Sequence, residues 1–192
     1  MKIRTITAGC NLSNTSIEEN KKLINNVVSD LDRINQFFEK KGYVVQTKRL
    51  STQPLNDTIK TKEEFNQICS LLQSFCSSRI DYFNIGPTRL SENLSDIISF
   101  FSSYPQGFCT VNLLKNNQIQ IDQVKKAATL IKKISSIEKQ GFANLRFAAL
   151  CNVNANTPFY PASYHQGSPS FGIGCENSDV VILAFSKSDS IK

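Results

Sequence analysis

The residues best suited to chemistry lie in one stretch late in the chain, Thr157 to Glu176. This stretch holds the only histidine, His165, whose ordinary pKa near neutrality suits a general acid or base. It also holds three of the eight glycines and three of the six prolines. In α/β proteins, loops that follow strands usually carry binding and catalysis. The pattern therefore predicts a functional loop, although it does not name a reaction.

Two further residues of this stretch are candidates for catalysis beside His165. Cys175 could be a nucleophile if His165 lowered the pKa of its thiol. Glu176 could be a carboxylate partner or a metal ligand, although a carboxylate near the start of a helix is also explained by the helix dipole. The cysteines and the histidine show none of the spacings typical of a zinc site. We therefore predict no metal site, and the cofactor stays open.

Candidates for substrate binding come from the same stretch and from the first predicted strand. They are Arg4, Asn11, Tyr160, Ser163, Tyr164, Gly172 and Gly174. The two glycines are compatible with phosphate binding, but neither the dinucleotide fingerprint nor the P-loop pattern is present. If the first strand ends at the same sheet edge as the loop, Arg4 and Asn11 could help to hold an anion there. Arg146 could join them or could be a solvated strand residue.

The charge of the chain is consistent with an anionic ligand. Lysine and arginine exceed aspartate and glutamate by 22 − 16 = 6, and the pI is about 9.0. Such a charge suits nucleic acid, acidic membranes or anionic metabolites. The lysine pairs are dispersed over predicted helices, and the aromatic residues follow the apolar stripes, which disfavours nucleic acid. We expect a small polar or anionic molecule as the ligand.

The six cysteines are expected to be free thiols, because most of them lie among apolar residues. The first residues, MKIRTITAG, lack the apolar run of a signal peptide. No window approaches the ~20 apolar residues of a membrane span. These features predict no membrane association and a cytoplasmic location.

The elements that must position the candidate site alternate between strand and helix. Strands are predicted over residues 2–7, 43–51, 82–85, 109–114 and 144–153, with helices over 16–41, 65–75, 94–101 and 124–137 between them. Ser16 and Glu19 form a capping box at the start of the first helix. This alternation predicts βαβ units with right-handed crossovers. We expect a single α/β domain over residues 1–192 with a parallel five-stranded sheet.

The segment after the candidate site is ambiguous from sequence. Residues 180–185 are continuously apolar and could form a buried strand or a helix that begins near Ser178. We favour a helix, because Phe171 to Gly174 already reads as a short extended piece before it.

Three segments resemble one known family. KIRTITAG near the N-terminus, PFYPASYH around Pro161 and SFGIGCENSD from Ser170 resemble the family called domain of unknown function 711. The resemblance implies one half of a ten-stranded barrel like that of pyruvate formate-lyase and other glycyl radical enzymes, in which two parallel halves pack antiparallel. Members of the family are longer, so the chain resembles their N-terminal half. The resemblance implies no activity, and because the short glycyl-radical motif is absent, radical chemistry is not inferred.

Two classes of function remain open from the sequence. The first is an enzyme, or the remnant of one, that acts on a small polar or anionic metabolite at the loop after the fifth strand. The second is a non-catalytic module that binds a ligand or a partner through the same loop. Half a barrel would leave an open strand edge and an uncovered apolar face. We therefore expect a homo-oligomer or a partner that supplies the missing half, unless the final segment folds back over the gap.

Overall fold

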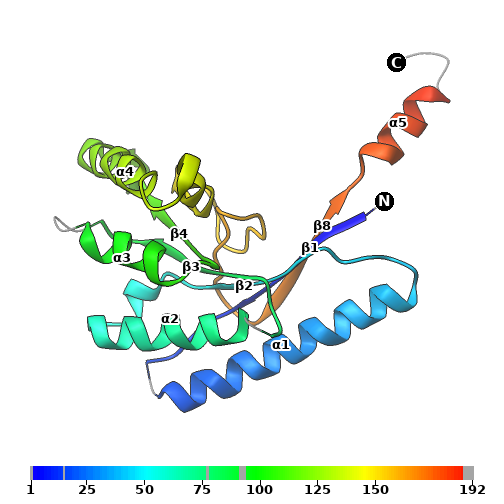
Figure 1. The fold of residues 1–192 in the computed structure, drawn as a ribbon, viewed down its shortest axis with the longest axis horizontal. Coiled ribbons are helices and arrows are strands. Elements are labelled where there is room, and N and C mark those ends of the chain that lie inside the picture. The colour runs from blue at the N-terminus through cyan, green and yellow to red at the C-terminus, as the bar shows by residue number, and fades with distance from the viewer. Residues whose placement is uncertain (1, 15, 77, 91–93, 188–192) are drawn as a thin grey trace.

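The computed structural model describes residues 2–14, 16–76, 78–90 and 94–187. Its elements, in order, are β1 (Lys2–Cys10), α1 (Ile17–Lys40), β2 (Lys48–Thr52), η1 (Leu55–Asp57), α2 (Lys62–Cys76), β3 (Tyr82–Thr88), α3 (Ser95–Ser103), β4 (Gly107–Asn112), β5 (Leu114–Lys115), β6 (Gln118–Ile119), α4 (Ile121–Ile134), η2 (Lys139–Arg146), β7 (Phe147–Leu150), β8 (Ser170–Glu176) and α5 (Ser178–Ser186). The α/β class predicted from the sequence is confirmed (Figure 1).

The main sheet of the described residues has six strands in the order β7-β4-β3-β2-β1-β8. Strands β1, β2, β3, β4 and β7 are parallel, whereas β8 pairs antiparallel with β1. The sheet is therefore mixed and six-stranded rather than parallel and five-stranded as predicted. The difference arises because the predicted short extended piece is part of a longer strand, residues 170–176, that pairs along β1. A two-stranded hairpin, β5–β6, stands apart from this sheet.

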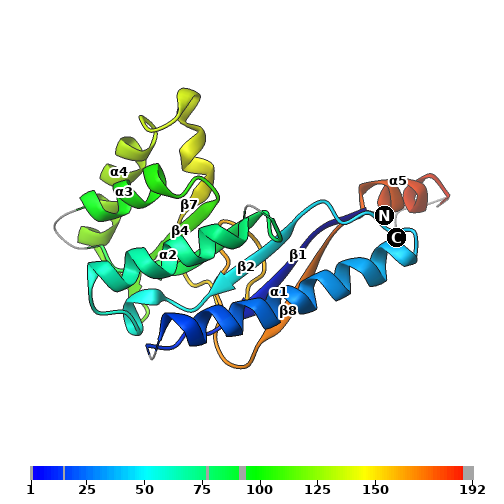
Figure 2. The same ribbon diagram turned by 60° about the horizontal axis from the view of Figure 1, so that its bottom comes forward.

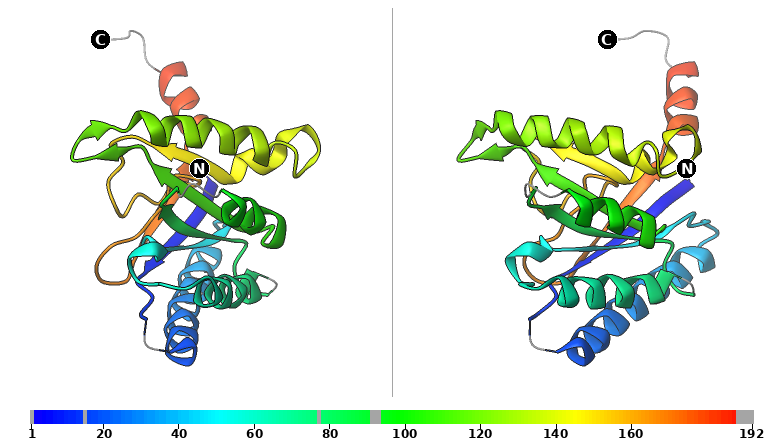
Figure 3. Two further views of the ribbon diagram at one scale, coloured as in Figure 1. Left: turned by 90° about the vertical axis from the view of Figure 1, so that its left-hand side faces the viewer. Right: turned by 60° about the vertical axis from the view of Figure 1, so that its left-hand side comes forward.

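The helices and the long loop lie on opposite faces of the sheet. Because the parallel strands follow one another in chain order, right-handed crossovers place α1 to α4 on the same face. The sheet curls, with these helices outside and the loop of residues 151–169 inside (Figures 1 and 3). We call the face that carries the loop the inner face. Its polar character follows from the strand residues that point there.

Helix α1 forms as its sequence predicts. Ser16 accepts a hydrogen bond from Glu19 N at 3.1 Å, which completes one half of the capping box. The apolar stripe is buried against the sheet, where Val27 and Leu31 face the core. The helix runs along the outer side of β1 and β8 (Figure 2).

Two cations tie α1 to β2 and to the turn before β3. Asp32 accepts hydrogen bonds from Lys48 Nζ at 2.8 Å and from Arg79 Nη2 at 2.7 Å. Burial alone would raise the pKa of Asp32, but the hydrogen bonds and charges of these cations together lower it below its ordinary value. Asp32 is therefore ionised at neutral pH and crosslinks the outer layer.

Helix α5 lies beyond the sheet, at the end of the β1–β8 pair (Figure 1). The sequence-based preference for a helix over a strand here is confirmed. None of its residues is buried, and its large hydrophobic side chains are 49–67% exposed. In the described part of the chain, no helix is long and apolar enough to span a membrane. All six cysteines are free thiols, as expected.

Candidate functional site

The loop of residues 151–169 is fixed to the inner face by hydrogen bonds to its backbone. Thr7 Oγ1 donates to Pro158 O at 3.0 Å, and Asn84 Nδ2 donates to Pro161 O at 2.7 Å. The backbone N–H of His165 donates to Thr52 O at 3.0 Å. Buried polar groups need such partners, because an unpaired one costs about 1–3 kcal/mol. The loop therefore supplies or accepts hydrogen bonds for these polar groups of the inner face.

Three candidate residues of the loop also make side-chain contacts that hold it in place. The hydroxyl oxygens of Ser163 and Ser51 lie 2.5 Å apart. Tyr160 donates its hydroxyl to Leu50 O at 2.5 Å, and Tyr164 donates its hydroxyl to Val153 O at 2.8 Å. Burial raises the pKa of Tyr160, so its hydroxyl stays protonated and remains a donor.

His165 is enclosed between the loop and β1. Its side chain is 2% exposed, and its Nε2 lies 3.2 Å from Gly167 O. Because a carbonyl only accepts, Nε2 carries the proton, and the unprotonated Nδ1 faces Gly9. Burial lowers the pKa of His165, so the ring is neutral at pH 7. Among the described residues, no carboxylate or thiol hydrogen-bonds to it.

The cavity beside His165 is small. It has a volume of about 60 Å³ and is lined in part by Thr7, Ser163 and Tyr164. A water molecule needs at least ~10–15 Å³, whereas ligand pockets commonly measure ~300–1,000 Å³. The space therefore suits a few waters but not a metabolite while the loop is docked.

Cys175 and Glu176 lie far from His165. Cys175 is exposed on β8 opposite Ile3, whereas His165 contacts Gly9 at the other end of β1. Ile3 and Gly9 are six positions apart along the strand, which is about 20 Å at ~3.3 Å per residue. The structure therefore does not bring the three candidates for catalysis together.

Gly172 and Gly174 allow close packing across the inner face. A Cβ on Gly172 would lie 2.7 Å from Pro158 Cβ, and one on Gly174 would lie 2.7 Å from the methyl group of Thr5. Both glycines are inside β8 rather than in a loop at a helix N-terminus. Their geometry is explained by packing, and it does not form a phosphate cradle.

The three candidates for anion binding outside the loop are also separated. Arg4 lies in the amino-terminal half of β1, whereas Asn11 is exposed beyond its carboxyl end. Arg146 is buried and forms an ion pair with Glu138 at 2.7 Å. Its other donors reach the backbone carbonyls of Phe101, Tyr104 and Gly107. Arg146 therefore joins η2 to the α3–β4 connection and serves structure.

The sequence did not predict a role for Arg49, whose side chain lies on the inner face beside the loop. Its guanidinium carbon lies 5.1 Å from the ring centroid of Tyr160 and 5.8 Å from that of Tyr82. Nε donates to Thr47 Oγ1 at 3.1 Å. Burial lowers the pKa of Arg49, and the charge of Arg4 acts in the same direction. In the described part of the chain, Arg49 forms no ion pair.

No local signal could have singled out Arg49, because KRLST reads as an ordinary strand. Its position follows from the register of the sheet, in which Arg49 pairs with Thr7 and with Tyr82. Neighbours in register on adjacent strands point to the same face. The strand pairing therefore places Arg49 beside the loop.

Comparison with known proteins identifies a family but no activity. No curated protein matches the chain. The sequence model of one family, described as Uncharacterised ACR (DUF711), matches residues 1–192. This match agrees with the resemblance carried by the three segments around β1, the loop and β8. The chain therefore belongs to the DUF711 family.

Proposed function

We propose that this protein binds a small anionic metabolite on the inner face, with Arg49 as the main contact. The observation that carries the proposal is a half-buried guanidinium that lies between two tyrosine rings and lacks an ion pair within the described residues. A partly buried charge without a counter-ion is costly to keep. Ionisable groups perturbed in this way are concentrated at functional sites.

The chemistry of Arg49 indicates the class of ligand. A guanidinium presents a planar set of donors that matches a carboxylate or a phosphate. Nε is occupied by Thr47, and the two terminal nitrogens have no hydrogen-bond partner within the described chain. The nearby positive charge of Arg4 favours an anion, whereas the negative charge of Asp81 acts in the opposite direction. Carboxylate and phosphate groups of small metabolites fit this arrangement.

The loop after β7 contributes to this site through Tyr160, which it holds against Arg49. His165 is neutral and enclosed, so its role in the docked state is to position the loop. The geometry therefore supports ligand binding more directly than catalysis. An enzyme of this kind would have to lift the loop to expose His165 to a substrate.

Isothermal titration with inorganic phosphate and citrate tests the proposal. A charge-assisted hydrogen bond contributes about 1.5–3 kcal/mol, so we expect Arg49→Gln to weaken binding by about 10-fold or more. Arg49→Lys keeps the positive charge but not the planar set of donors, so its affinity should lie between those of the wild type and Arg49→Gln. The control is Arg33→Gln, because Arg33 is exposed on α1 and pairs only locally with Asp30. Equal affinities for Arg49→Gln and Arg33→Gln would reject the site, as would a wild-type chain that binds neither probe.

A second candidate function is association with another chain, and α5 favours it. Five large hydrophobic residues of this helix are exposed: Val180, Val181, Ile182, Leu183 and Phe185. Apolar surface gathered in this way commonly marks an interaction site. We further propose that the curled sheet is half of a barrel, as the family resemblance implies. The antiparallel β1–β8 pair supports this. In a barrel made of two parallel sheets that run in opposite directions, the sheets would meet at an antiparallel pair of strands.

A further inference from the structure

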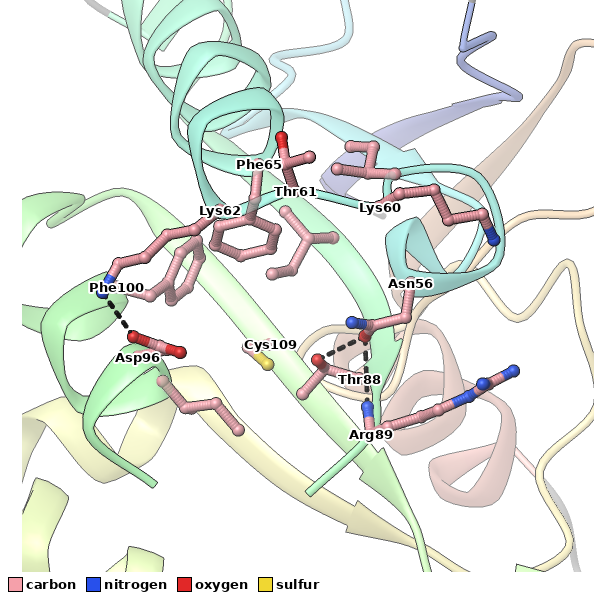
Figure 4. A pocket seen from close by; sticks show the side chains of 13 residues that line it. Asn56, Lys60, Thr61, Lys62, Phe65, Thr88, Arg89, Asp96, Phe100 and Cys109 are labelled. Atoms are coloured by element: carbon pink, nitrogen blue, oxygen red, sulfur yellow. Dashed lines mark hydrogen bonds and ion pairs between the residues drawn. The ribbon is translucent and has the colours of Figure 1, made fainter. Parts of the chain in front are cut away.

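A second cavity lies in the outer layer, at the carboxyl end of β3. It occupies about 250 Å³ between the first turns of α2 and α3 (Figure 4). Its walls are largely apolar and are formed by Ile59, Phe65, Ile85, Ile97, Phe100 and Cys109. In α/β sheets the carboxyl ends of strands are the usual place for ligands. This cavity is separate from the inner face, where Arg49 lies.

One polar group is directed into this apolar space. Asn56 Oδ1 accepts hydrogen bonds from Thr88 Oγ1 at 2.5 Å and from the backbone N–H of Arg89 at 3.1 Å. A backbone N–H can only donate, so the oxygen of the Asn56 amide is fixed on that side. The nitrogen, Nδ2, therefore points into the cavity, as Figure 4 shows. Within the described residues it has no acceptor.

The rim of the cavity carries charged side chains. Lys62 of α2 and Asp96 of α3 form an ion pair at 2.6 Å that joins the two helices on the side away from Asn56. Lys60 and Arg89 also line the rim, and their side chains run outward from it (Figure 4). These four charged residues line the opening within the part of the chain that the structure describes.

We propose that this cavity binds a small carboxylic acid with an apolar body, whose carboxylate accepts a hydrogen bond from Asn56 Nδ2. The apolar body would lie against Phe65, Phe100 and Ile85. The volume is below the ~300–1,000 Å³ of common ligand pockets, so the body is about the size of one ring or one branched chain. A wider hollow, lined in part by Pro54, Lys115 and Gln123, also borders Asn56.

The Cys109 thiol at the base of the cavity does not add a covalent step. Burial raises the pKa of Cys109 far above neutrality, so the thiol is protonated and a poor nucleophile. The cavity is therefore a reversible binding site.

Titration of the chain with benzoate tests the proposal. Binding is measured by calorimetry and by the shifts of backbone amide signals in NMR spectra. We expect saturable shifts in residues 56–65 and 94–100 with benzoate, and no shifts in these residues with acetate, which lacks the apolar body. Asn56→Asp is the discriminating variant, because it keeps an oxygen for Thr88 and for Arg89 N but replaces the donor by a negative charge. Benzoate affinity should fall at least 10-fold in this variant, while benzyl alcohol, which is uncharged, should bind both proteins alike.

Two further variants test where on the molecule benzoate binds. Ile97→Phe adds a ring to the cavity wall and should abolish the binding of both benzoate and benzyl alcohol. Arg33→Gln changes an exposed residue of α1, away from the cavity, and should leave benzoate binding unaltered. Undiminished benzoate binding by Asn56→Asp would overturn the proposal. Shifts confined to the inner face, or a wild-type chain that does not bind benzoate, would do the same.

Discussion

Replacing Gly9 by alanine tests whether His165 anchors the loop of residues 151–169. The new Cβ would lie 2.2 Å from His165 Nδ1 and 2.6 Å from its Cγ, so the ring must move. The backbone of Gly9 cannot retreat easily, because it pairs with Ser51 on β2 and Ser170 on β8. Overpacking of this kind costs about 1–3 kcal/mol, and the lower entropy of the unfolded alanine chain offsets about 0.4–1 kcal/mol. We expect a net loss of about 1–2 kcal/mol.

Urea unfolding of Gly9→Ala, His165→Ala and the double variant measures this effect. His165→Ala alone leaves a gap beside Gly9, and in the double variant the new methyl group enters that gap. The two changes should therefore be non-additive, with a coupling energy of about 0.5–3 kcal/mol. If Gly9→Ala costs less than about 0.5 kcal/mol and the two effects simply add, His165 does not pack on Gly9 as described.

Three other changes test the outer layer and α5. Leu31→Ala should lower the free energy of unfolding by about 2–5 kcal/mol, whereas Phe37→Ala on the exposed side of the same helix should cost under about 0.5 kcal/mol in the same urea assay. Asp32→Asn should be destabilising at pH 7. Because the folded pKa of Asp32 is lowered, the difference from wild type should shrink as the pH falls below about 4, and a constant difference in pH-dependent melting would contradict the ion pairs. Ile182→Asp should shift the mass measured by light scattering across a dilution series toward the monomer, and an unchanged mass would argue against association through α5.

The sequence predicts best those elements whose signals are local. The capping box at Ser16 and the stripe through Val27 and Leu31 lie within one helix, so α1 is read correctly at both ends. The ambiguous segment after Ser178 is also predicted correctly. A helix is favoured there because an extended piece at Phe171 already precedes the segment. Local patterns therefore suffice where an element depends on its own neighbours.

The features that the sequence does not predict depend on contacts between distant segments. The antiparallel β8 is recognised only as an extended piece, since nothing in residues 170–176 specifies β1 as its partner. Arg49 acquires its surroundings from the register with β3 and from Tyr160, which the loop delivers. His165 attracts attention as the single histidine, yet its enclosure is set by Gly9 on another strand.

The pairing of β1 with β8 has a consequence for the synthesis of the protein. β1 is the first strand of the sheet to leave the ribosome, whereas β8 is the last, and about 160 residues separate them. Synthesis proceeds at ~5–20 residues per second. The edge of β1 that pairs with β8 therefore stays unpaired for roughly 10–30 s. An open edge invites pairing with other chains, and charges on a strand oppose it. Lys2 and Arg4 are both charged and exposed on β1, so they oppose the pairing of this edge with other chains during this interval.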